Sequence, residues 1–268
     1  LIQRAQTMQV DVLAITDHDS TYGLADAHAA AQEHYPALRI IDGVEISTRW
    51  HSFEIHIVGL NIDTGHPALQ AFLADQQRKR EERAAKIADK LAKCGFEGTL
   101  ERARRYAGVG QITRAHFARV LVDNFQVATL EKAFKLYLGK GKRAAVKAEW
   151  PDIAAAVKVI QQAGGRAVLA HPIHYDMTTK WLRRLIAEFA EAGGDAAEVV
   201  FPGMSAEKQA LLHSIVAEYE LLASAGSDFH FPGRWTELGR CQLKSDTLTP
   251  VWHDWNLAVS QSSLKDPV

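Results

Sequence analysis

The sequence predicts an α/β fold in which a mostly parallel sheet or barrel is interrupted by a helical insertion. Short apolar runs recur along the chain, and the run at residues 10–15 is rich in β-branched residues and too short for a helix, which is typical of a buried strand. In the second half, such runs alternate with helical patterns that stop at Gly164-Gly165 and Gly193-Gly194. No strong strand run interrupts residues 66–149.

Each element follows from its local pattern. Strands are expected at residues 10–15, 39–44, 53–60, 167–170, 197–201 and 221–227. The helix after the first strand starts near Ser20-Thr21, where a hydroxyl can cap it. In the middle of the chain, a long helix begins at His66-Pro67, and two more begin at Thr113 and Thr129.

After Trp150 the strand and helix patterns alternate again, with helices expected from residues 153, 179 and 205. We therefore expect residues 1–65 and 150–268 to form one barrel domain. Residues 66–149 are expected to form a helical insertion domain that covers the active site. The chain begins at Leu1 within a helical pattern and without a start methionine, so a preceding segment is expected.

Composition limits the classes of partner. The 268 residues are 47% hydrophobic and 24% charged, which is ordinary for a soluble globular protein. The formal net charge of -1 gives no global attraction to nucleic acid or anionic membrane. Cys94 and Cys241 lack a CxxC neighbour, which argues against a disulfide framework or zinc ribbon and favours the cytoplasm. We expect no membrane partner, no reading of duplex DNA and no obligate protein partner.

Chemically active side chains gather at one kind of position, near the exit of an expected strand. Because the carboxyl ends of strands in an α/β barrel meet in one cup, these side chains are expected to converge. The expected metal ligands are His18, Glu45, His56, His171, Asp228 and His230. All of them except His56 are also the candidate catalytic residues.

A metal centre explains this set better than structural roles do. One histidine at the edge of an apolar run is more often a hydrogen-bonded structural residue than a ligand. Six donors in one buried cup would cost free energy unless a cation satisfied them. Oxygen and nitrogen donors without a thiolate suit hard and borderline divalent cations, and they accept manganese, iron and zinc alike.

Several neighbouring residues leave alternatives open. Asp17 and Asp19 are ligands, helix caps or partners that fix the tautomer of His18, and we favour the last role. Glu54 alternates in register with His56 and is a candidate to support the ligands. His174 is either a substrate contact or a loop histidine.

Arg114 and His116 lie at an expected helix start, where unpaired backbone N–H groups suit anions. The alternative is a solvated helix face.

These motifs resemble, in order, those of the PHP (polymerase and histidinol phosphatase) metallophosphoesterases. The resemblance covers essentially the whole chain. The matching segments are Ile15-Thr16-Asp17-His18-Asp19, Gly43-Val44-Glu45-Ile46-Ser47, residues 54–60, Ala170-His171-Pro172 and Gly226-Ser227-Asp228-Phe229-His230. Within the family, residues 113–119 and Trp235-Thr236-Glu237-Leu238-Gly239-Arg240 are most similar to the branch of RNase AM and the 3′,5′-nucleotide bisphosphate phosphatases.

The resemblance implies a distorted (β/α)7 barrel that holds up to three divalent ions, manganese first, with iron or zinc as alternatives. It implies that the six donors above are ligands and that Arg114 and His116 approach the phosphate. It also implies hydrolysis of nucleotide phosphate esters: 5′-3′ exoribonuclease activity on short RNA or rRNA 5′ ends, 3′-phosphatase activity on nucleoside 3′,5′-bisphosphates, or both.

The chain departs from the family pattern at its start. The family opens with a strand carrying an HxH pair and a following aspartate, and no such segment precedes Leu1. Two other functions remain as alternatives. One is a metal-dependent amidohydrolase, whose usual carboxylated lysine at a strand end has no candidate here, and the other is a metal-binding PHP module without catalysis.

Overall fold

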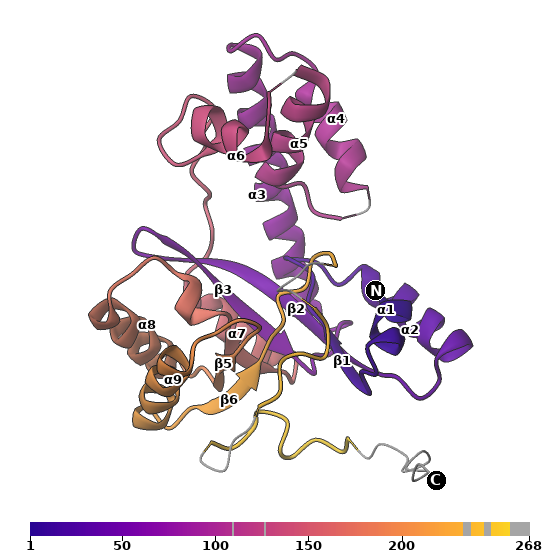
Figure 1. Ribbon diagram of the computed structural model, residues 1–268, viewed down its shortest axis with the longest axis vertical. Coiled ribbons are helices and arrows are strands. Elements are labelled where there is room, and N and C mark those ends of the chain that lie inside the picture. The colour runs from indigo at the N-terminus through magenta and orange to yellow at the C-terminus, as the bar shows by residue number, and fades with distance from the viewer. Residues whose placement is uncertain (109, 126, 233–236, 244–247, 258–268) are drawn as a thin grey trace.

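The computed structural model describes residues 1–108, 110–125, 127–232, 237–243 and 248–257. A curled, mixed six-stranded sheet lies at the centre of the lower body, which is formed by the described residues of 1–65 and 150–257 (Figure 1). The strands lie side by side in chain order. They are β1 (Val12–Ile15), β2 (Arg39–Trp50), β3 (Phe53–Leu60), β4 (Arg166–Leu169), β5 (Ala196–Val200) and β6 (Leu222–Ala225). The α/β class with a barrel-like curl is thus confirmed.

Most strand pairings are parallel, as we expected, and β3 is the exception. β1 pairs with β2 in parallel, and β4, β5 and β6 are parallel to one another. In contrast, β3 runs antiparallel to both of its neighbours, because the chain returns from β2 through a tight hairpin at His51 and Ser52. The amino end of β3 therefore lies at the edge of the sheet where β4 ends.

Helices of the lower body cover the outside of the sheet. α7 (Ile153–Gln162) packs on β3 and β4, and α9 (Ala206–Glu218) packs on β5 and β6. α8 (Thr179–Glu191) lies beside α9, whereas α1 (Ile2–Thr7) and α2 (Gly23–His34) cover the β1 side. The main core lies between these layers, with Ile57, Ile160, Leu185, Phe189 and Ile215 fully buried.

The insertion stands on one long helix. α3 (Pro67–Ala92) rises from the lower body and carries the remaining insertion helices at its far end (Figure 1). These are α4 (Thr99–Ala107), α5 (Arg114–Phe125), α6 (Leu130–Ala133) and the short π-helix η1 (Phe134–Leu138). They enclose a separate core that includes Leu91, Phe117, Leu121 and Leu138. α4 was not among the expected helices.

Helix starts test the sequence rules directly. Thr129, Asp152 and Ser205 each accept a hydrogen bond from the backbone N–H three residues later, as an N-cap does. The expected cap at Ser20-Thr21 is wrong. α2 begins later, after Tyr22, and within the described part of the chain no side chain caps it.

A buried polar cluster fastens α3 to the sheet. Arg80 donates to Asp19 Oδ2 through Nε (2.8 Å) and through a second guanidinium nitrogen, and it also donates to Ser47 Oγ at 2.7 Å. Gln76 donates to the backbone carbonyl of Ser47 at 2.9 Å. Asp19 is 1% exposed and Arg80 8%, so this ion pair is shielded from water. The foot of the insertion is therefore tied to the loop after β1. No helix in the part of the chain that the structure describes is long and apolar enough to cross a membrane.

Candidate metal centre

The Glu45 carboxylate is the centre of the site. Its Oε1 lies 2.8 Å from His56 Nδ1 and 3.2 Å from His171 Nε2, and its Oε2 lies 3.6 Å from His18 Nδ1. The His56 and His171 nitrogens are 3.2 Å apart. Four of the six expected ligands thus meet around one carboxylate, although up to 153 positions separate them in the chain.

Sheet topology explains this convergence. A parallel bridge joins His18 to Glu45, because the chain leaving β1 continues alongside β2. His56 pairs with Ser47 across the hairpin, and the next residue, Ile57, pairs with Leu169 near the end of β4. Glu45 and His56 therefore lie within strands, whereas we had expected them at strand exits. The antiparallel direction of β3 still brings His56 beside His171.

Burial and neighbouring groups shift the pKa values of His18, Glu45 and His171. Burial lowers the pKa of His18, so its imidazole is neutral near pH 7. Burial would raise the pKa of Glu45, but hydrogen bonds from His171 and His56 and the charges of nearby histidines hold it well below its usual value. Burial would likewise lower the pKa of His171, whereas its hydrogen bond to Glu45 and the nearby carboxylates raise it.

The donor set fits a divalent cation. The ligand atoms of His18, Glu45 and His56 all lie within 4.8 Å of one another. Donors bound to one ion at about 2.1 Å lie roughly 3 to 3.5 Å apart, which is close to the spacing around Glu45. His18 Nδ1 is buried and has no hydrogen-bond partner among the residues that the structure describes. An unsatisfied nitrogen facing a carboxylate is costly without a ligand, and a cation would remove that cost.

The other two expected ligands lie at the rim of the centre. The His230 ring is 6.0 Å from the His18 ring, and its Nδ1 lies 3.4 Å from Asp228 Oδ1. Asp228 is near enough for its charge to raise the pKa of His171. Both rim side chains are more exposed than the inner four.

Backbone conformation is unusual at two expected ligands that follow a strand. His171 has a φ of 33° and Asp228 a φ of 47°, in the left-handed region that residues other than glycine rarely adopt. Such conformations persist where surrounding contacts hold them, and they cluster at functional sites.

The insertion brings cationic groups to the edge of this centre. Arg114, at the start of α5, lies 3.4 Å from a carboxylate oxygen of Glu54, and Arg83 of α3 lies 3.5 Å from the other. Glu54 precedes His56 by two residues on β3, so both guanidinium groups flank the ligand strand. Burial, together with the charges of Arg114 and Arg80, lowers the pKa of Arg83 to about 10 despite the attraction of Glu54. Glu54 therefore contacts the two arginines, whereas we had expected it to support the metal ligands.

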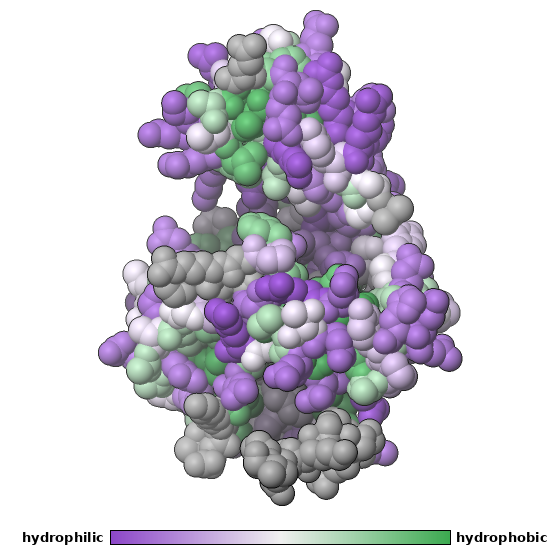
Figure 2. Space-filling model, turned by 45° about the vertical axis from the view of Figure 1, so that its right-hand side comes forward, coloured by the Kyte–Doolittle hydropathy of each residue, from purple (hydrophilic) through white to green (hydrophobic). Residues whose placement is uncertain are grey.

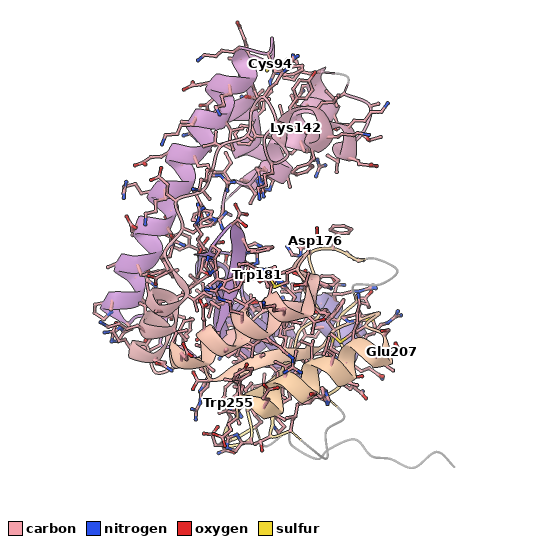
Figure 3. The ribbon with its side chains drawn as sticks, turned by 90° about the vertical axis from the view of Figure 1, so that its left-hand side faces the viewer. Cys94, Lys142, Asp176, Trp181, Glu207 and Trp255 are labelled. Carbon is pink, nitrogen blue, oxygen red and sulfur yellow. The ribbon has the colours of Figure 1, made fainter. Side chains whose placement is uncertain are left out.

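The head of the insertion faces the barrel end that carries the centre. In Figure 3 its head, marked by Lys142 and Cys94, overhangs the loop of Asp176, which follows His171 closely in the chain. The surface is hollowed between the insertion and the lower body (Figure 2). A substrate in this hollow would contact both parts.

The two candidate substrate histidines occupy different parts of the site. His116 Nδ1 accepts a hydrogen bond from the backbone N–H of Thr113 at 3.1 Å, at the start of α5. This leaves the proton of the neutral ring on Nε2. His174, in the 3₁₀ turn η2 (Pro172–His174), stacks 5.8 Å from His171 and meets Phe201 edge-on at 3.9 Å.

The two aspartates beside His18 behave differently. Burial raises the pKa of Asp17, while the nearby His18 and His230 lower it, so Asp17 lies next to the centre. Both carboxylate oxygens of Asp19 are instead occupied by Arg80, Gln76 and the backbone N–H of Ser47. The favoured role of Asp19 as a partner of His18 is therefore wrong, and its carboxylate joins the insertion to the barrel.

Sequence reasoning missed Glu198. It lies in the otherwise apolar β5, and its Oε2 accepts a hydrogen bond from the backbone N–H of His171 at 2.6 Å. Burial raises its pKa to about 7. A lone carboxylate inside an apolar strand was the available signal, because such a group is costly unless the fold uses it.

Sequence comparison gives close relatives over nearly the full chain. A 5′-3′ exoribonuclease of Haemophilus influenzae is 46% identical, covering 94% of this chain and 91% of that protein. The 5′-3′ exoribonuclease Rnm of Escherichia coli is also 46% identical, over 95% of this chain and 87% of its own length. A 3′,5′-nucleoside bisphosphate phosphatase of Chromobacterium violaceum is 38% identical, with coverages of 95% and 89%.

Solved structures share the fold. An amidohydrolase from Chromobacterium violaceum with bound sulfate and no metal superposes with a TM-score of 0.83 and 38% identity, covering 94% of this chain and 87% of that one. A protein from Bifidobacterium adolescentis, assigned as a metal-dependent phosphoesterase, superposes with a TM-score of 0.77 at 24% identity, with coverages of 93% and 86%.

A search of protein-family models gave no match. Trp235 and Thr236 of the branch motif lie outside the described residues. Identity of 38 to 46% over nearly the whole chain nevertheless establishes the relationship. The chain belongs to the PHP metallophosphoesterases, in the branch of the 5′-3′ exoribonucleases and the 3′,5′-nucleotide bisphosphate phosphatases.

Proposed function

We propose that this protein hydrolyses phosphate esters at the 5′ ends of short RNA or rRNA, at the 3′ position of nucleoside 3′,5′-bisphosphates, or at both. The observation that carries the proposal is a Glu45-centred donor cluster together with the guanidinium group of Arg114, which contacts Glu54, two residues before His56 on β3. The names of the relatives support both substrate classes. We place the reaction in the cytoplasm, in keeping with two free cysteines.

His18, Glu45, His56 and His171 would hold the inner cation, with Asp228 and His230 as ligands at the rim. Divalent cations bound there supply Lewis-acid neutralisation of phosphate charge and acidify water for attack. Manganese is our first choice, with iron or zinc as alternatives and up to three ions in all. Donors of this kind accept all three metals, so availability decides among them.

The insertion would anchor the substrate phosphate. Arg114 can turn from Glu54 to a phosphate oxygen, because it is partly exposed and their 3.4 Å contact is long for a charged pair. Nε2 of His116 would donate a second hydrogen bond, since Nδ1 is already occupied. His174 would line the opposite side, next to His171. A histidine bound to metal cannot also protonate the leaving oxygen, so no ligand is assigned that role.

One site can serve both activities. Each reaction needs a terminal phosphate held by cationic groups and a scissile ester held beside the cations. An RNA 5′ end and a nucleoside 3′,5′-bisphosphate both present two phosphates separated by one ribose. The anchoring groups of the insertion and the donor cluster of the barrel are suited to bind one phosphate each.

The amidohydrolase alternative has one supporting observation, the description of the Chromobacterium violaceum structure. It lacks the usual chemistry, because none of the six strands in the described residues contains a lysine. The phosphoesterase therefore remains our proposal.

The test combines metal content with turnover. We would purify the protein with its complete natural chain, measure bound metals by elemental analysis, and follow phosphate release from adenosine 3′,5′-bisphosphate, with AMP as the control substrate. A 5′-phosphorylated RNA of a few nucleotides tests the exonuclease activity. We expect release from the bisphosphate or the RNA with Mn²⁺ present. Bound metal without any turnover would instead support the catalytically inert module.

A further inference from the structure

Glu198 touches two ligand-bearing loops at once. Its Oε2 accepts the backbone N–H of His171, which follows β4, at 2.6 Å. Its other oxygen lies against Gly226, which follows β6 and precedes Asp228 by two residues. Glu198 itself lies on β5, the strand between these two. One carboxylate from the middle of β5 therefore contacts the segments that follow the strands on both sides of it.

The contact with His171 stabilises an unfavourable backbone. His171 has a φ of 33°, and the strain of such a conformation must be offset by specific contacts. The backbone N–H of His171 donates its hydrogen bond to the side chain of Glu198 on the neighbouring strand.

The contact with Gly226 leaves no room for a side chain. A Cβ at position 226 would overlap Glu198 Oε1 and lie 2.5 Å from its Cδ. Gly226 does not have a positive φ, so the need for glycine here is steric. The thiol of Cys241 also donates to the Gly226 carbonyl at 3.1 Å, which fixes the other side of the same peptide.

We propose that Glu198 is a positioning residue of the metal centre, which holds the His171 and Asp228 loops at the spacing that the cation needs. Its Oε2 accepts the hydrogen bond of the His171 N–H, and its Oε1 packs against Gly226. This inference rests on the proposed metal centre, and it assigns a role to a residue outside the expected ligand set. Partners of this kind commonly tune metal affinity by 10- to 100-fold.

Three variants separate the possible roles of Glu198. Glu198→Leu keeps the volume and removes the acceptor. Glu198→Gln keeps one acceptor oxygen and removes the charge. Gly226→Ala retains the Glu198 carboxylate but displaces it. Gly65→Ala is its control, because a Cβ there meets Asp63 Oδ1 at an ordinary 3.4 Å.

Two measurements on the full chain read out the effect. Titration calorimetry gives the affinity for Co²⁺, and NMR gives the hydrogen-exchange rate of the His171 amide in metal-free protein. We expect Glu198→Leu and Gly226→Ala to weaken Co²⁺ binding by about 10- to 100-fold and to speed exchange at His171. Glu198→Gln and Gly65→Ala should leave the Co²⁺ affinity and the exchange rate of the His171 amide close to those of the unchanged protein.

The results distinguish this inference from the proposed function. If Glu198→Leu leaves both quantities unchanged, Glu198 does not position the loop. If Glu198→Gln weakens Co²⁺ binding as much as Glu198→Leu does, the negative charge of Glu198 contributes to Co²⁺ affinity as that of a direct ligand would. The positioning role would then be wrong. If the unchanged protein binds no Co²⁺, the proposed metal centre fails, while amide exchange at His171 still decides whether Glu198 holds the loop.

Discussion

The barrel and the insertion bring opposite chemistry to the same hollow. The end of the sheet carries an ionised carboxylate among imidazoles, whereas the insertion carries guanidinium groups. Glu45 is buried and the three inner histidines are half-buried, whereas Arg114 is more exposed and contacts Glu54 at 3.4 Å. This difference predicts that the proposed metal binding and the proposed phosphate anchoring are separable, so variants in one region should spare the other function.

The largest effect is expected at the centre of the barrel cluster. Glu45→Gln removes the negative charge that His56 and His171 both contact, so bound metal should be lost. The rate of phosphate release should fall on the order of 10³-fold or more. When residues act as one catalytic group, removing one of them lowers the rate nearly as much as removing all of them. Elemental analysis and kinetics on the same sample test this. Full metal content and unchanged turnover in Glu45→Gln would show that Glu45 takes no part in metal binding or catalysis.

The next effect is expected at the joint between the two regions. Arg80→Leu leaves the Asp19 carboxylate buried and unpaired, so the free energy of unfolding should fall by about 3–5 kcal/mol. Urea denaturation followed by circular dichroism measures it. A change below 1 kcal/mol, on the scale of an exposed pair, would mean that the buried pair does not fasten the insertion.

A smaller effect is expected at the anchoring group of the insertion. Arg114→Ala should keep the metal content and lower kcat/KM for adenosine 3′,5′-bisphosphate roughly 100-fold, the typical loss for a charge-stabilising donor. Arg114→Lys should recover part of it, because lysine keeps the charge but lacks the bidentate fork. Loss of metal in Arg114→Ala would show that the two regions are not separable.

The smallest effect is expected on the outer face of α3. Arg78 pairs with Asp75 and Glu82 on an exposed surface, where ion pairs contribute little. Arg78→Ala should change the free energy of unfolding by less than about 1 kcal/mol and leave kcat/KM as it is. It is therefore the matched control for Arg80→Leu, two residues away on the same helix. A large loss of activity would extend the anchoring surface along α3.

Local patterns were enough to predict most of the fold. β3 at residues 53–60 and α3 from Pro67 were predicted nearly to the residue, because a short apolar run and a proline at a helix start are local signals. The reversal of β3 was not predicted, since strand direction depends on pairing between distant segments. The extension of β2 to Trp50 was missed for the same reason, because that part of the strand gains its partner from the hairpin.

The site was predicted to a similar degree. The convergence of His18, Glu45, His56 and His171 followed from their places near strand ends, even though two of them lie inside strands. The Asp19–Arg80 pair could not be predicted, because 61 positions separate its members and neither local sequence indicates the other. Glu198 had a visible signal, but its partner is a backbone N–H, which a sequence does not display.

The most direct test of the metal centre is anomalous X-ray diffraction from crystals of this protein grown with Mn²⁺. We expect a strong manganese peak about 2.1 Å from the Glu45 carboxylate and from nitrogens of His56 or His171, the usual bond length for such donors. Crystals soaked in Mn²⁺ with no anomalous peak among these side chains, or with the peak on another surface, would contradict the account.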